Sequence, residues 1–175
     1  MTYPTFTNGQ VLPASDLNAI GLWLVKSQTV GSGVSSVTVT GAFSADYDNY
    51  KIVYSGGVGS TPQAIQLQLG SATTLYYGIL TYVAYSTGAT SNVTTNNGGL
   101  WQYVGEASSG MTWVNIDVFN PFLSKFTQFG GPYVGTVAGT VGGYHAANSS
   151  YTSFTLSVAG TLTGGTISVY GYRKA

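Results

Sequence analysis

The stretch Ile65-Gln66-Leu67-Gln68-Leu69 (IQLQL) alternates apolar and amide side chains without a break. Successive side chains of a β-strand point to opposite faces of the sheet, so this pattern predicts a strand with one buried face and one exposed face. The same period of two recurs at residues 50–54, before this stretch, and at residues 154–158, near the end of the chain. The sequence therefore predicts β structure on both sides of its midpoint.

Other short segments that are apolar or alternate in polarity follow one another from residue 28 onward, and turn signals such as Ser55-Gly56-Gly57 and Gly164-Gly165 separate them. The further predicted strands lie at residues 37–39, 79–85, 101–104, 112–119, 126–129, 133–137 and 166–172. About nine or ten short strands with no helix between them are typical of an antiparallel arrangement. We therefore expect an all-β protein, an antiparallel β-sandwich of jelly-roll type.

Two segments are less regular. Residues 86–100 (STGATSNVTTNNGGL) are almost entirely small and polar and predict a long exposed loop. Residues 130–143 are rich in glycine but keep apolar residues at intervals, which fits a loop or a strand that another backbone approaches closely. We favour the strand.

The N-terminal segment differs from the rest of the chain. Residues 1–13 contain two prolines and predict an extended lead-in, whereas residues 14–25 carry apolar side chains at helical spacing after Ser15, a suitable N-cap. We expect a short helix there and divide the chain into an anchor or oligomerisation segment, residues 1–27, and a β-sandwich domain, residues 28–175. The side chains expected to anchor the protein on a larger particle are Phe6, Leu12, Leu17, Ile20 and Leu24.

Charge is scarce: only five basic and five acidic residues occur among 175, and the net charge is zero. Average domains carry about a quarter charged residues. Without a basic excess the chain lacks the electrostatic attraction that nucleic acids and anionic membranes require, so neither is an expected partner. A surface so poor in charge favours a protein that is covered by copies of itself or by a larger assembly.

Groups that perform catalysis are also few. The chain has no cysteine and a single histidine, His145, which excludes thiol chemistry and a site with several histidines. Glu106 and Asp117 would meet across a turn at residues 107–110, and such a carboxylate pair is what glycosidases use. We nevertheless expect a non-enzymatic protein with no catalytic residue, cofactor or metal, and keep a polysaccharide-degrading enzyme as a remote alternative.

Recognition of another molecule by the protein surface is the class of function that these arguments leave. Tyrosine, serine, glycine and asparagine suit adaptable binding surfaces, and all four are abundant here. Aromatic rings also stack on sugar faces. We expect glycan or subunit contacts at Tyr82, Tyr85, Trp101 and Tyr103, with burial in the core as the alternative for each ring.

Two segments resemble a known class of protein. Residues 4–20 (PTFTNGQVLPASDLNAI) are similar to the opening of many structural proteins of tailed-bacteriophage virions, and residues 164–175 (GGTISVYGYRKA) resemble the closing strand of small phage fibre and tail modules. The resemblance implies β-sandwich subunits, commonly trimeric, on the outside of the virion, and it supplies no catalytic residue.

The expected function is therefore that of a trimeric tail-fibre or spike-type module that contacts host surface glycans. The alternative is a capsid decoration, head-fibre or tail-adaptor protein with a purely structural role. The expected partners are other copies of the chain, other virion proteins and a host surface polysaccharide.

Overall fold

The computed structural model describes residue 9 and residues 21–173, and in this part every regular element is a β-strand. The prediction of an all-β protein is confirmed. The strands are β1 (Leu22–Thr29), β2 (Val34–Thr40), β3 (Asn49–Ser55), β4 (Val58–Gly59), β5 (Gln63–Leu69), β6 (Tyr76–Ala84), β7 (Thr90–Gly98), β8 (Trp101–Ser108), β9 (Met111–Phe119), β10 (Thr127–Val134), β11 (Val137–His145), β12 (Ser153–Thr163) and β13 (Thr166–Tyr172). Over these residues the structure has no helix of the length and apolarity that crossing a bilayer requires.

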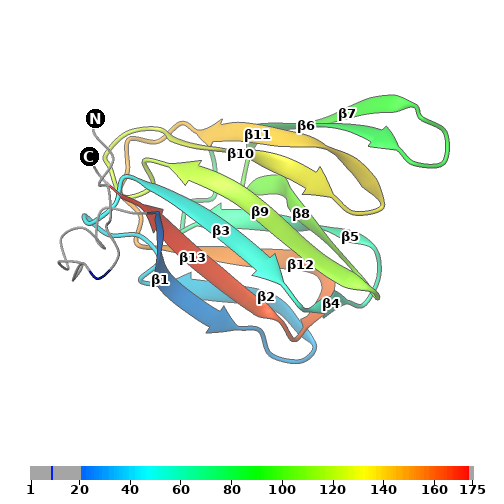
Figure 1. Cartoon of the computed structure of the whole chain (residues 1–175). Coiled ribbons are helices and arrows are strands. Elements are labelled where there is room, and N and C mark those ends of the chain that lie inside the picture. Colours follow the sequence, from blue (N-terminus) through cyan, green and yellow to red (C-terminus); the bar gives the residue numbers. More distant parts are fainter. Residues whose placement is uncertain (1–8, 10–20, 174–175) are drawn as a thin grey trace.

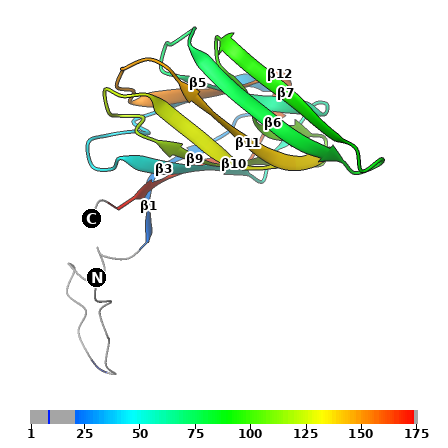
Figure 2. The same ribbon diagram turned by 90° about the horizontal axis from the view of Figure 1, so that it is seen from above.

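All thirteen strands belong to one antiparallel sheet, whose main path has the order β2-β12-β5-β8-β9-β10-β11-β6-β7, with β4 paired to β12 beside it (Figure 1). The path branches at β9, which also pairs with β3, and the branch continues through β13 to β1. The sheet curls, so that β12 and β5 lie across from β13 and β3 (Figures 1 and 2). Phe43 lies between these layers and contacts Tyr50 of β3 and Phe154 of β12, with ring centroids 4.9 and 5.7 Å apart.

The core lies between these layers and follows the predicted alternation. Ile65, Leu67 and Leu69 of β5 are fully buried, whereas the intervening Gln66 and Gln68 are only partly buried. In strands β3, β9, β12 and β13 the same period of two places alternate side chains in the core. The prediction that IQLQL forms a strand with one face in the core is thus confirmed.

The prediction of a long loop at residues 86–100 is wrong, because Thr90–Gly98 forms β7 and pairs with β6. β7 is made of small polar residues and has little apolar periodicity of its own. The backbone groups on its inner edge pair with β6, and Val93, opposite Leu80, packs against the core. Tertiary pairing therefore overrides the local composition.

The strand favoured within residues 130–143 is confirmed, since β10 and β11 cover most of that segment. Its glycines permit close packing against β6. A Cβ atom added at Gly139 or Gly143 would lie 2.0 or 2.1 Å from a carbonyl oxygen of β6. Larger residues there would force the two strands apart.

The expected N-terminal helix is absent from the described residues. Leu22, Leu24 and Val25 lie in β1, where Leu22 pairs with Tyr172, and Gly21 before them has a φ of 92°. That left-handed conformation cannot continue a right-handed helix. Leu24 is 58% exposed on the strand. The other expected anchor residues, Phe6, Leu12, Leu17 and Ile20, and the first part of the expected helix lie outside the described residues.

The two ends of the described chain lie together. Because Leu22 pairs with Tyr172, β1 begins where β13 ends, at one end of the curled sheet (Figure 2). The expected division between residues 27 and 28 falls inside β1.

Candidate functional site

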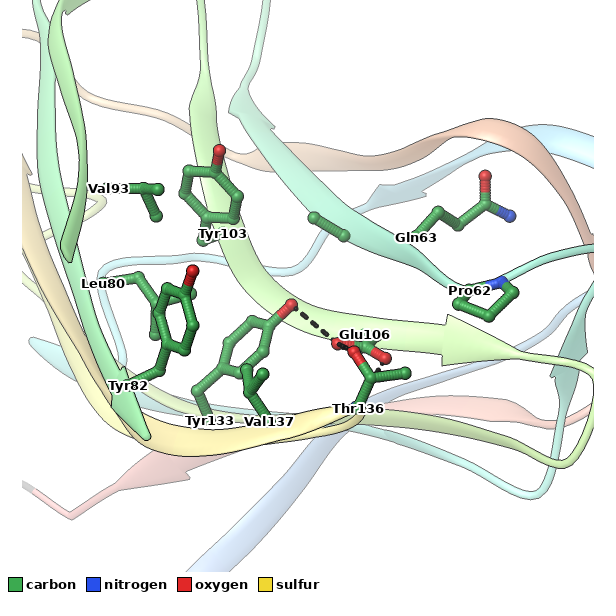
Figure 3. Close-up of a pocket in the computed structure, with 11 residues that line it drawn as sticks. Pro62, Gln63, Leu80, Tyr82, Val93, Tyr103, Glu106, Tyr133, Thr136 and Val137 are labelled. Atoms are coloured by element: carbon green, nitrogen blue, oxygen red, sulfur yellow. Dashed lines mark hydrogen bonds between the residues drawn. The ribbon is translucent and has the colours of Figure 1, made fainter. Parts of the chain in front are cut away.

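A pocket of about 330 Å³ opens between the β5–β8 pair and the four strands β10, β11, β6 and β7 (Figure 3). Aromatic and aliphatic side chains dominate its wall, and a single carboxylate, Glu106, lies among them. The lining residues are Pro62, Gln63, Ala64, Leu80, Tyr82, Val93, Tyr103, Glu106, Tyr133, Thr136 and Val137. Ligand pockets in proteins commonly have about 300–1,000 Å³ and this mixture of apolar wall and few polar groups.

Strand register directs these side chains into the pocket. Glu106 pairs with Ala64, and their neighbours Gly105 and Ile65 form the adjacent pair, so Glu106 and Ala64 occupy the face opposite to Ile65. Across the pocket, Gly139 of β11 pairs with Tyr133 on one side and with Tyr82 on the other. A Cβ atom at Gly139 would lie 2.0 Å from the Thr81 carbonyl oxygen, so this glycine lets β11 pack closely against the strand that carries Tyr82.

Glu106 is held by three hydrogen bonds from the end of β10 and the turn after it. Its Oε1 accepts the backbone N–H of Thr136 at 2.7 Å, and its Oε2 accepts the hydroxyls of Tyr133 and Thr136, each at 3.2 Å. The residue is 4% exposed, and no cationic side chain of the described chain forms an ion pair with it. A buried carboxylate with neutral donors alone is an uncommon arrangement.

The contact also sets the state of Tyr133. Burial raises the pKa of the Tyr133 hydroxyl well above its ordinary value, and the negative charge and hydrogen bond of Glu106 add to the effect. The hydroxyl therefore remains protonated at neutral pH and continues to donate to the carboxylate.

The four aromatic residues expected at a binding surface lie in three different environments in the structure. Tyr82 and Tyr103 both line the pocket. Trp101 is fully buried, with its ring against Phe129 at 4.3 Å, so it does not form part of the exposed surface of the chain. Tyr85 is 64% exposed just beyond β6 and outside the pocket.

Sequence reasoning missed Tyr133 and Thr136 and gave Glu106 a different partner. Both missed residues lie in the glycine-rich segment, where Gly135 permits the close approach: a Cβ atom there would be 2.3 Å from the Glu106 Cδ atom. In the sequence, the only indication of this contact is Gly135 itself, because a glycine in a turn allows another group to approach the backbone closely.

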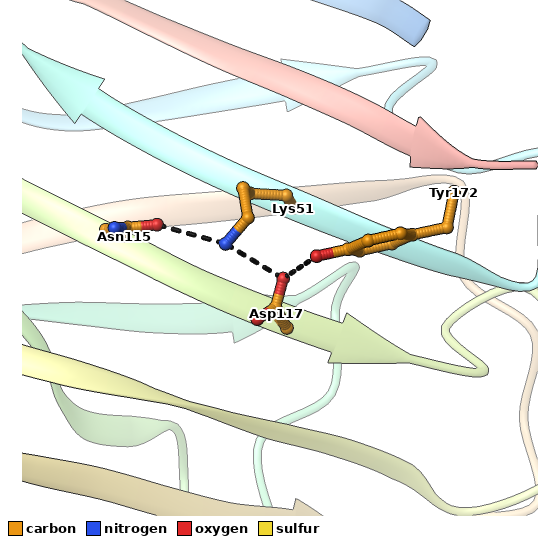
Figure 4. A network of polar contacts seen from close by, with 4 residues as sticks. All are labelled: Lys51, Asn115, Asp117 and Tyr172. Carbon is orange, nitrogen blue, oxygen red and sulfur yellow. Dashed lines mark hydrogen bonds and ion pairs between the residues drawn. The ribbon is translucent and has the colours of Figure 1, made fainter. Parts of the chain in front are cut away.

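Glu106 and Asp117 do not share a site. Glu106 lies opposite Trp113, and Asp117 is four residues further along β9, which corresponds to about 13 Å of strand. Asp117 instead binds Lys51, with Nζ 3.0 Å from Oδ1, and accepts the hydroxyl of Tyr172 (Figure 4). Lys51 also donates to Asn115 Oδ1 at 3.2 Å. Within residues 9 and 21–173, no three acidic or histidine side chains gather as metal ligands would.

The comparisons with known proteins return no match: no protein-family model, no curated protein and no solved structure is similar to this chain. Its function is therefore to be inferred from the chemistry of the pocket and the surface.

Proposed function

We propose that this protein is a non-enzymatic structural component of a bacteriophage virion, exposed on the particle as a trimeric tail-fibre or spike-type module that contacts host surface glycans. The observation that carries the proposal is the pocket of Tyr82, Tyr103, Tyr133 and Glu106. The resemblance of residues 4–20 and 164–175 to phage virion modules supports the location. The curled antiparallel sheet supports a sandwich of jelly-roll type.

The pocket has the chemistry that a sugar requires. Tyrosine rings offer flat apolar faces against which the C–H face of a pyranose packs, and they lose little side-chain entropy on binding. The hydroxyls of Tyr82 and Tyr103 have no hydrogen-bond partner among the described residues, so they are available to sugar hydroxyls. A carboxylate at the wall accepts from sugar hydroxyl or amine groups.

A test is to measure saturable adsorption of the purified protein to host cells and to isolated surface polysaccharide, with the Tyr82→Ala variant beside the Tyr85→Ala variant. Tyr82 lines the pocket and Tyr85 lies outside it, and both are tyrosines of the same hairpin. We expect Tyr82→Ala to weaken adsorption at least tenfold and Tyr85→Ala to leave it unchanged. Equal adsorption by both variants would count against the pocket.

A second function, capsid decoration or tail adaptation with a structural role alone, is favoured by a different observation. Two groups of large apolar side chains are exposed outside the pocket. One is on β1, at Leu22, Trp23 and Leu24, which are 42%, 37% and 58% exposed. The other is on the outer face of β6 and its neighbours, where Phe126, Tyr77 and Tyr144 stack beside the exposed Ile79 and Val83. Apolar patches of this kind are typical of protein contacts.

Sedimentation equilibrium and particle binding separate the two functions. A trimer that binds host polysaccharide supports the attachment module. A protein that binds capsids or tails lacking it, and no polysaccharide, supports decoration. Replacement of both Leu22 and Leu24 by serine tests whether β1 carries the contact, and we expect it to shift the protein toward monomer.

A further inference from the structure

We infer that the pocket binds a cationic ammonium group, the protonated amine of an amino sugar, between the rings of Tyr82, Tyr103 and Tyr133 and against the carboxylate of Glu106. The inference rests on the proposed glycan contact and narrows its ligand. It follows from three properties of the pocket: its charge, its aromatic wall and its remaining hydrogen-bonding capacity.

The charge of the pocket is uncompensated. Glu106 is 4% exposed, and its three partners are a backbone N–H and two hydroxyls, all of them neutral. Of the cationic side chains in the described chain, Lys51 is paired with Asp117, and the others form no ion pair with Glu106. Burying a carboxylate is unfavourable, and neutral donors offset the loss of water less completely than a nearby cation does. A ligand ammonium is the charge that this site lacks.

The aromatic wall favours the same ligand. Tyr82, Tyr103 and Tyr133 come from β6, β8 and β10 and surround the space beside Glu106 (Figure 3). The face of an aromatic ring carries negative electrostatic potential and attracts ammonium groups, most strongly where water is excluded. Gly139 pairs with both Tyr133 and Tyr82, so the register of β10, β11 and β6 places these two rings on the same wall of the pocket.

The remaining hydrogen-bonding capacity matches an amine. A carboxylate has about four acceptor positions, and the protein uses three of those on Glu106. One acceptor position is left on Glu106, together with the hydroxyl oxygens of Tyr82 and Tyr103, and the buried Nε2 of Gln63 is an unused donor that a sugar hydroxyl can satisfy. A primary ammonium has three donors and no acceptor, so it can be satisfied by this set. An acidic sugar would bring a second carboxylate beside Glu106 and is disfavoured.

The test compares two trisaccharides that differ only at nitrogen, tri-glucosamine and tri-N-acetylglucosamine, by isothermal titration calorimetry at low salt. At about pH 5.5 the free amines are protonated, whereas the acetylated nitrogens are neutral. We expect the full chain to bind tri-glucosamine at least tenfold more tightly. The Glu106→Gln variant, similar in shape, should remove this preference, whereas Asp46→Asn, which removes an exposed charge outside the pocket, should leave it intact.

A second pair of variants keeps the inference testable if Glu106→Gln does not fold. Tyr82→Leu removes a ring face and should lose the preference, whereas Tyr82→Phe retains the ring and should keep most of it. Equal affinity for the two trisaccharides would overturn the ammonium inference and leave the glycan contact standing. A preference that persists in Glu106→Gln and Tyr82→Leu would also overturn it. Absence of binding to these two sugars together with absence of adsorption to host polysaccharide would overturn both proposals.

Discussion

The Nε2 atom of His145 lies 3.0 Å from the carbonyl oxygen of Thr74, and the histidine is 1% exposed. A carbonyl only accepts, so Nε2 carries the hydrogen and donates. Nδ1, 3.3 Å from the Tyr151 hydroxyl, then accepts from that hydroxyl. The ring also packs on Tyr76, with centroids 4.3 Å apart. Burial lowers the pKa of His145, an effect that the bond to Thr74 partly opposes.

The stability of the protein should therefore fall in mild acid. Since the pKa of His145 is lower in the folded state than the ordinary value of 6.5, the unfolded chain binds the proton first. The contribution of this histidine is fully present above pH 6.5 and is lost as the pH falls through its folded value. Urea unfolding of the wild type and of His145→Gln between about pH 8 and pH 5 measures the effect. Equal loss of stability in both proteins would show that other groups cause it.

Replacing Trp101 by alanine should destabilise the protein by about 3–5 kcal/mol, the usual effect of removing a fully buried tryptophan. Its ring meets Tyr76 edge-on at 5.4 Å, and its N–H donates to the Tyr144 carbonyl at 3.3 Å. The same change at the exposed Tyr85 should alter the free energy of unfolding by less than about 0.5 kcal/mol. Chemical denaturation of the two variants makes the comparison, and a mild effect at Trp101 would contradict its place in the core.

Gly135→Ala should disturb the pocket directly. The added Cβ would lie 2.3 Å from the Glu106 Oε2 atom, which forces either the turn or the carboxylate to move. We expect a loss of about 1–3 kcal/mol in stability, as overpacking usually causes. Gly110→Ala in the β8–β9 turn is the control, because its Cβ would meet no atom within 4 Å. Similar thermal unfolding of both variants would contradict the contact.

Asp117→Asn should lower the pKa of Tyr172. Burial and then the hydrogen bond and charge of Asp117 raise that pKa to about 12. A raised pKa means that the folded state keeps the proton longer, so this contribution to stability is lost as the pH rises from 10 through about 12. Titration of carbon-13-labelled tyrosine by NMR should show an earlier transition in the variant. An unchanged midpoint for Tyr172 would mean that burial alone sets its pKa.

Deletion of residues 1–20 should leave a folded sheet with little change in thermal unfolding. Deletion of residues 1–29 removes β1 as well, which unpairs one edge of β13 from Thr166 to Tyr172. An exposed edge of this length promotes aggregation, so we expect the longer deletion to aggregate or to unfold at lower temperature. Size-exclusion chromatography and circular dichroism distinguish the two. Failure of the shorter deletion to fold would make residues 1–20 necessary for the core.

The sequence predicted the strands whose own side chains alternate in polarity, because a half-buried sheet imposes that period locally. Ile65–Leu69 is such a case. β7 escaped prediction because most of its side chains are polar and its pairing with β6 supplies the order. β1 was mistaken for the end of a helix because Leu17, Ile20 and Leu24 have helical spacing, while its actual partner, β13, lies at the other end of the chain.

The pocket was harder to foresee than the fold. The ring chemistry of Tyr82 and Tyr103 marks them in the sequence, but Tyr133 joins them only through the register of β10 against β11 and of β11 against β6. The sequence indicates Asp117 as the partner of Glu106, because only a short turn separates their two strands. Its true partners, Tyr133 and Thr136, are 27 and 30 residues away.

The pairing of Leu22 with Tyr172 places the start of β1 and the end of β13 at the same end of the sheet. Both described ends of the chain leave from one pole. In the sheet register the last residues of β9 lie beside the end of β13, so the start of β9, and with it Glu106, Tyr133 and Thr136, lies toward the opposite pole. A chain tethered by either end, to a particle, a fusion partner or a sensor chip, would hold this pocket away from the point of attachment.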